Sequence, residues 1–118
     1  METTITGREA AIRLGTVLRD HKALDVRIMD LTGRNTWADF FVLATVTSSA
    51  HSRGLQRHIL ELIPELDLEI HRTRNKMPDG EEWHLIDLGP IVVHLMSATA
   101  RSFYDLEKLW FDSVPVDF

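Results

Sequence analysis

Residues 39–46, DFFVLATV, constrain the fold more than any other part of the chain. They form a nearly unbroken run of apolar, β-branched and aromatic residues, and they follow a turn sequence at residues 32–35. A run of this length and composition indicates a central strand that is covered on both faces. The sequence therefore predicts a sheet with other elements packed against it.

Further strands are predicted on both sides of this run. Residues 23–31 alternate in polarity, which is typical of a half-buried strand with Leu24, Val26 and Ile28 on its inner side. Residues 67–72 predict a short strand with Leu68 and Ile70 pointing inward, and residues 73–82 predict a loop. The last two strands, residues 82–88 and 91–96, form a hairpin around Gly89 and Pro90.

Three helices complete the pattern. Thr6 and Glu9 form a capping-box pattern before the first helix, which is expected to end near His21. The second helix is predicted over residues 47–63, with Thr47, Ser48 or Ser49 as its N-cap. The third runs from about 98 to 110, and the remaining residues form a short tail after about 111. The expected class is α/β (α+β), with a mixed sheet of about five strands and helices packed on it.

The chain has 118 residues, of which 44% are hydrophobic and 26% charged, and it contains no cysteine. These values predict one domain over residues 1–118 that buries a core without disulfides. No apolar run approaches the ~20 residues that span a bilayer, and no signal peptide is recognisable, so we expect a cytoplasmic protein. The net charge of −5 argues against broad nucleic-acid binding.

The residues themselves do not predict a reaction centre. His51 and His58 lie seven residues apart on one helix, but no third zinc ligand follows at a useful spacing. Asp67 and Glu69 alternate on a predicted strand, where a nucleotidyltransferase would hold magnesium, yet the phosphate-binding glycine turn of such enzymes is missing. We therefore expect no cofactor and no metal, with the nucleotidyltransferase-related enzyme kept as an alternative.

The C-terminal third carries more large apolar side chains than one helix face buries. On a continuous helix, Phe103, Leu106 and Trp110 share one stripe and Tyr104 shares another with Lys108. Trp83 is predicted to lie on the sheet face opposite to Leu88. Exposed aromatic residues of this kind anchor protein interfaces. The alternative is that a further helix covers this face as well.

Two long segments resemble a known family. They are WADFFVLATVTSSAHSRGLQRHILE and WHLIDLGPIVVHLMSATARSFYDLEKLW, and with them about residues 9–110 resemble the ribosomal silencing factor family, also called RsfS or Iojap. The chain departs from the family pattern at Pro90, where an acidic residue is usual, and at Val46 and Ala50. The resemblance implies a nucleotidyltransferase-like fold without known enzymatic activity.

The resemblance also implies a function and a site. It implies a translational repressor that binds the large ribosomal subunit at universal ribosomal protein number fourteen and blocks joining of the small subunit when nutrients are scarce. Relatives in organelles imply the alternative of a large-subunit assembly factor. The partner-binding positions that carry over are Trp83, Leu88, Met96, Tyr104 and Lys108. We also expect a possible homodimer, no membrane association, and little or no direct nucleic-acid binding.

Overall fold

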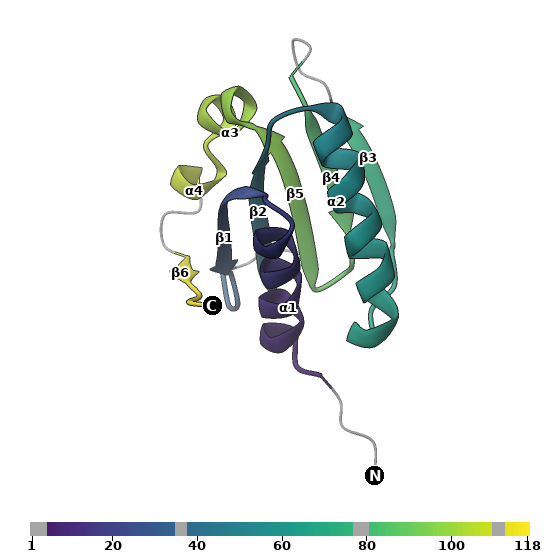
Figure 1. Ribbon diagram of the computed structural model, residues 1–118. Helices are drawn as coiled ribbons and strands as arrows, with labels where there is room; N and C mark the ends of the chain where they lie inside the picture. Colours follow the sequence, from purple (N-terminus) through teal and green to yellow (C-terminus); the bar gives the residue numbers. More distant parts are fainter. Residues whose placement is uncertain (1–4, 35–37, 77–80, 110–112) are drawn as a thin grey trace.

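The computed structural model describes residues 5–34, 38–76, 81–109 and 113–118. They form a six-stranded sheet in the order β3–β4–β5–β2–β1–β6 (Figure 1). The strands are β1 (Leu24–Asp30), β2 (Phe40–Val46), β3 (Arg72–Lys76), β4 (Trp83–Asp87), β5 (Ile91–Ser97) and β6 (Val114–Pro115). Strands β2 and β5 pair in parallel, and the other neighbouring strands pair antiparallel. The predicted mixed sheet of the α+β class is confirmed.

The central strand β2 is buried along its whole length, as its composition predicted. Its side chains alternate between two cores. Phe40, Val42, Ala44 and Val46 face one core, and Phe41 and Leu43 face the other. We call these the first and the second face of the sheet. Burial on both faces explains why this strand needs apolar residues at every position.

Two long helices, α1 (Gly7–Asp20) and α2 (Ser49–Leu62), cover the first face (Figure 1). Both begin where the sequence predicted. The Thr6 hydroxyl accepts a hydrogen bond from the Glu9 amide at 3.1 Å, and the Ser48 hydroxyl accepts one from the His51 amide at 3.0 Å. Each cap of this kind stabilises a helix by about 1 kcal/mol.

The strand predicted over residues 67–72 is wrong. After α2 the chain forms a 3-10 helix, Ile63–Leu66, which ends at Asp67 with a φ of 55°. Leu68 is only partly buried, and Ile70 is exposed. The strand in this region is instead β3, which shares only Arg72 with the predicted strand and otherwise occupies residues that were predicted to be a loop. Its polar side chains are tolerated because pairing with β4, from Arg72 opposite Asp87 to Lys76 opposite Trp83, needs only the backbone of an edge strand.

Leu24 also departs from its predicted inward position. A β-bulge interrupts the pairing of β1 with β2 between Leu24 and Arg27, and Asp25 within it has a φ of 45°. An extra residue in one strand shifts the alternation of its side chains. Leu24 is consequently exposed, whereas Ile28, beyond the bulge, lies in the first core.

The third predicted helix is two helices, α3 (Ala98–Tyr104) and α4 (Leu106–Leu109). Asp105 separates them with a φ of 42°, and its amide donates to the Arg101 carbonyl at 2.9 Å. Its carboxylate accepts from the Lys108 amide at 3.2 Å and so caps α4. Because of this break, Phe103 and Leu106 do not share one buried stripe: Phe103 is exposed and Leu106 is buried. Trp110, the third residue of that predicted stripe, lies outside the described residues.

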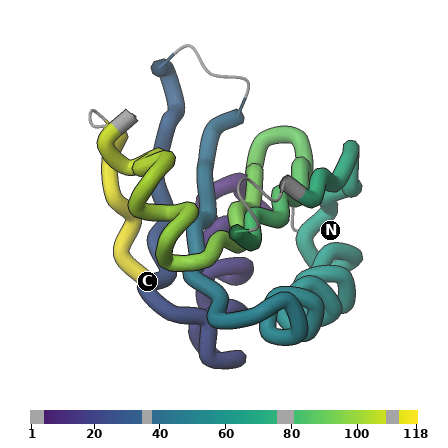
Figure 2. The backbone as a smooth tube through the Cα atoms, turned by 90° about the horizontal axis from the view of Figure 1, so that it is seen from above, coloured from purple at the N-terminus to yellow at the C-terminus, as the bar shows by residue number. Residues whose placement is uncertain are grey.

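The C-terminal tail adds the sixth strand. In β6, Pro115 lies opposite Met29, and Val114 lies opposite Asp30. Figure 2 shows this end of the chain (yellow) running beside β1. Val116 is buried in the first core, and the Arg19 guanidinium packs 3.8 Å above the Phe118 ring. The C-terminal segment thus has no secondary structure tendency of its own. It is held in place by the pairing of Val114 and Pro115 with β1 and by the burial of Val116.

Candidate docking surface

A row of rings leads from the surface at α3 into the second core. Phe103 and Tyr104 stand 5.0 Å apart, Tyr104 and Trp83 4.7 Å, Trp83 and His94 6.1 Å, and His94 and Phe41 4.8 Å, measured between ring centroids. We call these five residues the aromatic row. Phe103 is 77% exposed and Tyr104 39%, whereas Trp83 is 7% exposed. The row therefore presents aromatic surface only at its outer end.

Trp83 was expected at the surface, and this expectation is wrong. It lies on the second face, opposite to Leu88 as predicted, but Tyr104 of α3 packs against it. Its indole Nε1 donates to Nδ1 of His94 at 3.2 Å, so its polar atom is satisfied inside the protein. The alternative that a helix covers this face is the one that the structure shows.

Leu88 and Met96, which the family resemblance carried over as partner-binding positions, are both buried. Leu88 is buried with the first core, and Met96 is buried with the second. The reason for Leu88 is the alternation along the hairpin, which directs it toward the side where α1 and α2 lie. The reason for Met96 is that α3, which follows β5 directly, contributes Ala100 to the same core. Neither side chain is available to a partner at the surface of the molecule.

Tyr104 and Lys108 are the two predicted site residues with exposed side chains. They lie on α3 and α4, on either side of the break at Asp105. Phe103 joins them, although the continuous-helix interpretation placed it in the core. The exposed candidate surface therefore consists of Phe103, Tyr104 and Lys108, and we call it the α3–α4 surface. Trp83 supports it from below.

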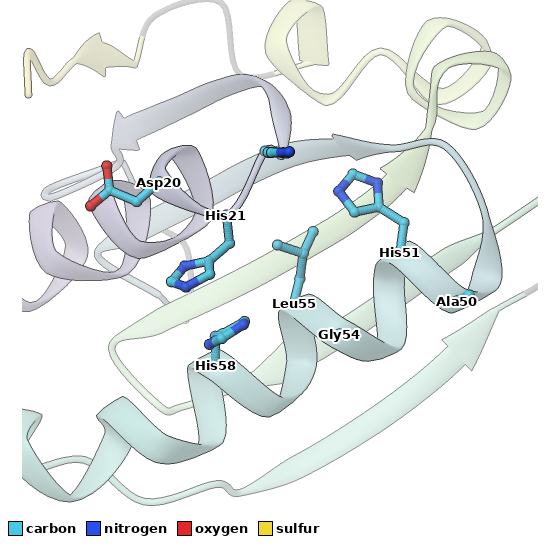
Figure 3. A pocket seen from close by; sticks show the side chains of 8 residues that line it. Asp20, His21, Ala50, His51, Gly54, Leu55 and His58 are labelled. Carbon is cyan, nitrogen blue, oxygen red and sulfur yellow. The ribbon is translucent and has the colours of Figure 1, made fainter.

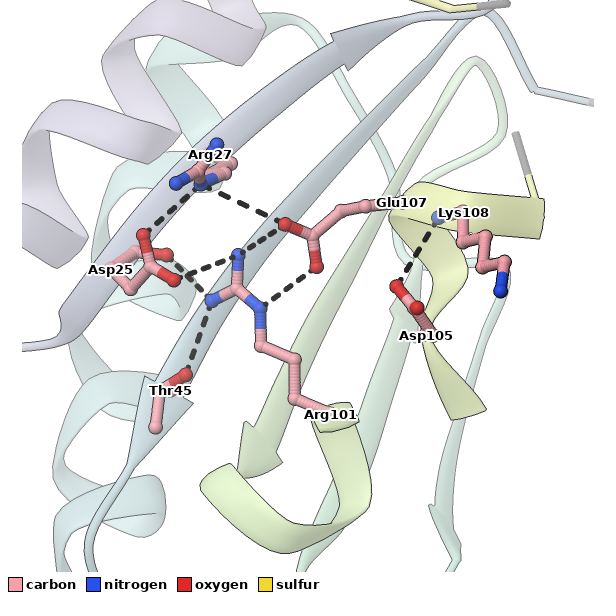
Figure 4. A network of polar contacts seen from close by, with 7 residues as sticks. All are labelled: Asp25, Arg27, Thr45, Arg101, Asp105, Glu107 and Lys108. Atoms are coloured by element: carbon pink, nitrogen blue, oxygen red, sulfur yellow. Dashed lines mark hydrogen bonds and ion pairs between the residues drawn. The ribbon is translucent and has the colours of Figure 1, made fainter. Parts of the chain in front are cut away.

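A buried arginine holds the α3–α4 surface in place, and the sequence analysis missed it. Arg101 lies on α3 and is 7% exposed. Its guanidinium donates to the Glu107 carboxylate at 3.1 and 3.3 Å, to the Thr45 hydroxyl at 3.1 Å, and to the Asp25 carbonyl. Figure 4 shows these contacts converging from β1, β2 and α4.

The bulge in β1 supplies part of this network. Asp25 offers both its carbonyl oxygen and its carboxylate to Arg101, the latter at 3.7 Å, and it also binds Arg27 at 3.0 Å. The hydrogen bond and the charge of Asp25 raise the pKa of Arg27 above its usual value. A planar guanidinium with several donors suits such a convergence of oxygens. The available signal was a lone arginine among small residues, Ala98 and Ala100, six positions before Glu107.

The residues considered for catalysis or metal binding do not come together as predicted. Asp67 and Glu69 precede β3, so they do not alternate on one strand as predicted. His51 Nδ1 accepts from the Thr47 amide at 3.0 Å, and the His58 ring stacks on His21 at 3.5 Å. Within the described ranges no group of three or more His, Cys, Asp or Glu side chains is placed to hold a metal ion. No described helix is long and apolar enough to cross a membrane.

The chain is similar in sequence to a known protein family and to several of its members. Residues 4–118 match a protein family described as "Ribosomal silencing factor during starvation". "Ribosomal silencing factor RsfS" of Treponema pallidum is 43% identical over 104 residues, which cover 87% of this chain and 91% of the relative. "Mitochondrial assembly of ribosomal large subunit protein 1" of Mus musculus is 28% identical over 98 residues, which cover 82% of this chain and 43% of the relative.

Solved structures agree with these sequence matches. A crystal structure of a protein from Chromobacterium violaceum aligns with a TM-score of 0.74 at 26% identity, covering 89% of this chain and 87% of that one. A crystal structure from Bacillus halodurans aligns with a TM-score of 0.70 at 29% identity, covering 91% and 96%. The sheet and its helices are thus shared with experimentally determined relatives.

Proposed function

Because the chain belongs to the ribosomal silencing factor family, we propose that it is a cytoplasmic translational repressor of the large ribosomal subunit. It binds universal ribosomal protein number fourteen and sterically blocks joining of the small subunit, which lowers translation under nutrient limitation. The observation that carries this proposal is the family match over residues 4–118, almost the whole chain. The mechanism uses no catalytic step.

The α3–α4 surface is the proposed docking site. Aromatic side chains bury a large area at a low cost in conformational entropy, and they are enriched in the centres of protein interfaces. Phe103 and Tyr104 offer such area, and Lys108 adds a positive charge on the next helix. Trp83 and Met96 act from beneath, since their packing determines where α3 lies. Leu88 contributes only to the stability of the core.

Steric exclusion is sufficient for repression. A domain of this size covers about 800 Å² of a partner in a standard interface. A small subunit approaching the same area of the large subunit is then excluded if the two bound positions overlap. No bond is made or broken, so the degree of repression depends on occupancy and residence time.

The proposal is tested by co-sedimentation with purified large subunits and by a subunit-joining assay. The native chain is expected to bind large subunits and to reduce the formation of joined ribosomes. The double variant Phe103→Ala, Tyr104→Ala is expected to weaken binding by about 2 kcal/mol or more, roughly thirtyfold. Its unfolding midpoint should fall modestly, because the Tyr104 ring packs on the buried Trp83, so binding is compared under conditions where the variant is fully folded. Ser102→Ala, at an exposed neighbouring position of α3, is the matched control and should bind normally.

Two outcomes would contradict the proposal. If the native chain does not bind large subunits, the assignment of the partner fails. If the double variant binds and blocks joining like the native chain, the α3–α4 surface is not the docking site.

A role in large-subunit assembly is the second candidate, and the name of the mouse relative favours it. Gradient profiles distinguish the two roles in cells that lack the protein. Accumulation of precursor particles indicates assembly, whereas an excess of joined ribosomes during starvation indicates blocking. Self-association through the same exposed aromatic residues stays a prediction, and concentration-dependent sedimentation of the native chain measures it.

A further inference from the structure

One surface of α2 differs in charge from the rest of this acidic chain. Residues 47–60, which contain most of α2, include Arg53 and Arg57 but no aspartate or glutamate. Both arginine side chains are exposed, and neither forms a hydrogen bond or ion pair with the part of the chain that the structure describes. Their charge is therefore free to act on something outside the molecule.

Other arginines of the chain have partners within it. Arg13 pairs with Glu65, Arg27 with Asp25, Arg72 with Asp87 and Arg101 with Glu107, and Arg19 packs on Phe118. An arginine that pairs within its own chain contributes to folding or to surface solvation. Among the described residues, Arg74 of β3 is also exposed and lacks such a partner, but Arg53 and Arg57 lie close together on one helix and so can act on one ligand.

The two arginines are neighbours on one stripe of the helix. Residues four apart on a helix have Cβ atoms about 5–6 Å from each other. Together with Ala50, Gln56 and Leu60, they line a groove of about 500 Å³ on the outer side of α2. This groove has no aromatic side chain of the kind that anchors protein interfaces.

Further basic groups continue this surface toward α1. A pocket of about 280 Å³ beside the groove is lined by Lys22 and by three histidines, His21, His51 and His58 (Figure 3). Asp20 is the acidic residue of this lining. Glu82 is nearby, but its carboxylate accepts a hydrogen bond from the Ser49 hydroxyl at 2.9 Å. Lysine and histidine side chains thus outnumber acidic ones in the lining of this pocket.

We propose that this surface, which we define as the basic face of α2 (Arg53 and Arg57), contacts the phosphate backbone of ribosomal RNA on the large subunit. The inference rests on the proposed function, because that function supplies the RNA. Arginine binds phosphate oxygens in a bidentate manner, and two arginines one turn apart are placed to engage neighbouring phosphates of one strand. Contacts of this kind position a protein without reading sequence.

The topology of the sheet makes this contact compatible with docking through α3 and α4. Strands β2 and β5 are parallel, and Val46 at the end of β2 lies opposite Ser97 at the end of β5. The helices α2 and α3 begin shortly after these residues. Both therefore start at the same end of the strands, one on each face of the sheet (Figure 1). One end of the molecule therefore presents an aromatic surface and a basic surface together.

The double variant Arg53→Gln, Arg57→Gln tests this inference. Glutamine has nearly the helix propensity of arginine, so α2 is retained. The affinity for intact large subunits should fall roughly tenfold at about 0.1 M salt. The slope of log K against log salt concentration should decrease by about 2. Affinity for isolated ribosomal protein number fourteen should not change.

Arg8→Gln, Arg13→Gln on α1 is the matched control, because it removes the same two charges from exposed positions at the other end of the helix layer. It should leave the affinity and the salt slope for large subunits nearly unchanged. Equal losses in both double variants would mean that net charge, not this surface, is responsible, and the inference would be overturned. An equal loss of affinity for the isolated protein would assign the basic face to an acidic protein segment instead, and would also overturn it.

A second measurement reports on RNA directly. The chain has no cysteine, so Leu60→Cys, at a half-exposed position in the groove, carries a tethered iron chelate at one known place. Bound to large subunits, it should generate hydroxyl radicals that cleave ribosomal RNA at a few positions, with the cysteine-free native chain as the background. A bound protein without cleavage overturns the inference, whereas failure of the native chain to bind would instead reject the proposed function.

Discussion

On the first face of the sheet, two helices of 14 residues each bury rows of aliphatic side chains, whereas on the second face two helices of 7 and 4 residues meet at a break. The long helices are fixed by their hydrophobic area. The short ones bury few side chains, among them Ala100 and Leu106, and depend in addition on the contacts of Arg101. A short amphipathic segment thus needs a polar anchor where a long one does not.

This difference has a functional consequence. A helix held by hydrophobic contacts turns most of its large apolar residues inward, so its outer side is mainly polar. The outer side of α2 carries Arg53 and Arg57, with Leu60 as its exposed large apolar residue. A helix held by a guanidinium can leave aromatic residues outside, as Phe103 and Tyr104 are. The proposed docking site lies on the face with the polar anchor.

The largest effect is expected on the first face. Leu14 of α1 is fully buried in the first core, and Leu14→Ala should lower the free energy of unfolding by about 3 kcal/mol, because it leaves a cavity between α1 and the sheet. Urea denaturation measures this change. The affinity of the remaining folded protein for large subunits should not change. If the fully folded variant has a lower affinity for large subunits, the packing of the first face affects the docking site on the second. The two faces would then not act independently.

A smaller loss of stability with a larger loss of binding is expected for Arg101→Met. The substitution should lower the free energy of unfolding by about 2 kcal/mol. This is less than for a fully buried ion pair, because Glu107 and Asp25 remain partly in solvent. Removing the anchor also frees α3, so affinity for large subunits should fall at least as much as in the Phe103→Ala, Tyr104→Ala variant.

The control for this prediction is Arg13→Met, which removes an exposed ion pair with Glu65. Exposed pairs contribute about 0–1 kcal/mol, so its stability should be almost native. If Arg101→Met binds normally, the α3–α4 surface does not depend on its anchor, and hydrophobic contacts alone position both faces.

The smallest effect concerns the edge of the first face. Partial burial lowers the pKa of His84, and the nearby Glu82 opposes this shift. Above the usual histidine pKa of about 6.5, the side chain is neutral in both the folded and the unfolded chain and contributes nothing. As the pH falls through that value, the unfolded chain takes up a proton more readily than the folded protein, so the native protein loses stability.

His84→Gln removes this difference. Relative to the native protein, the variant should become progressively more stable between about pH 7.5 and 5, which urea denaturation at a series of pH values measures. His21→Gln, at an exposed position, serves as a comparison for histidines in general. If the stability of His84→Gln has the same pH dependence as that of the native protein, His84 is not the cause of the loss of stability at low pH.

Prediction from the sequence succeeded where one local pattern decided the outcome. The buried run of β2, the cap Thr6, the position of the second cap within residues 47–49, and the hairpin of β4 and β5 follow from composition and spacing alone. Even Pro90 fits, since the hairpin closes with a hydrogen bond from the Leu88 amide to the Ile91 carbonyl at 2.9 Å and needs no donor from the proline. These features depend on residues close together in the chain.

Prediction failed where contacts between residues far apart in the sequence decided the structure. The burial of Trp83 depends on where α3 lies, and α3 is fixed by Arg101 binding to Asp25, 76 positions away, and to Thr45, 56 away. The helix break at Asp105 supports the same network. Helical periodicity treats residues 98–110 as one helix and therefore placed Phe103 inside. Strand alternation placed Trp83 on a sheet face that was expected to be uncovered. The structure shows the reverse for both residues.

The sequence by itself determined that this chain forms a mixed sheet with helices, and its motifs identified the family. Only the tertiary structure decided which aromatic side chains reach the surface, because that depends on a buried charge finding oxygens from three separate elements. The tertiary structure likewise brought the basic face of α2 to the same end as α3, through the parallel pairing of β2 with β5. Hydrophobic patterns depend on residues that are close in the sequence, so they can be recognised from it. The partners of a buried charge come from distant residues, so they are known only once the chain has folded.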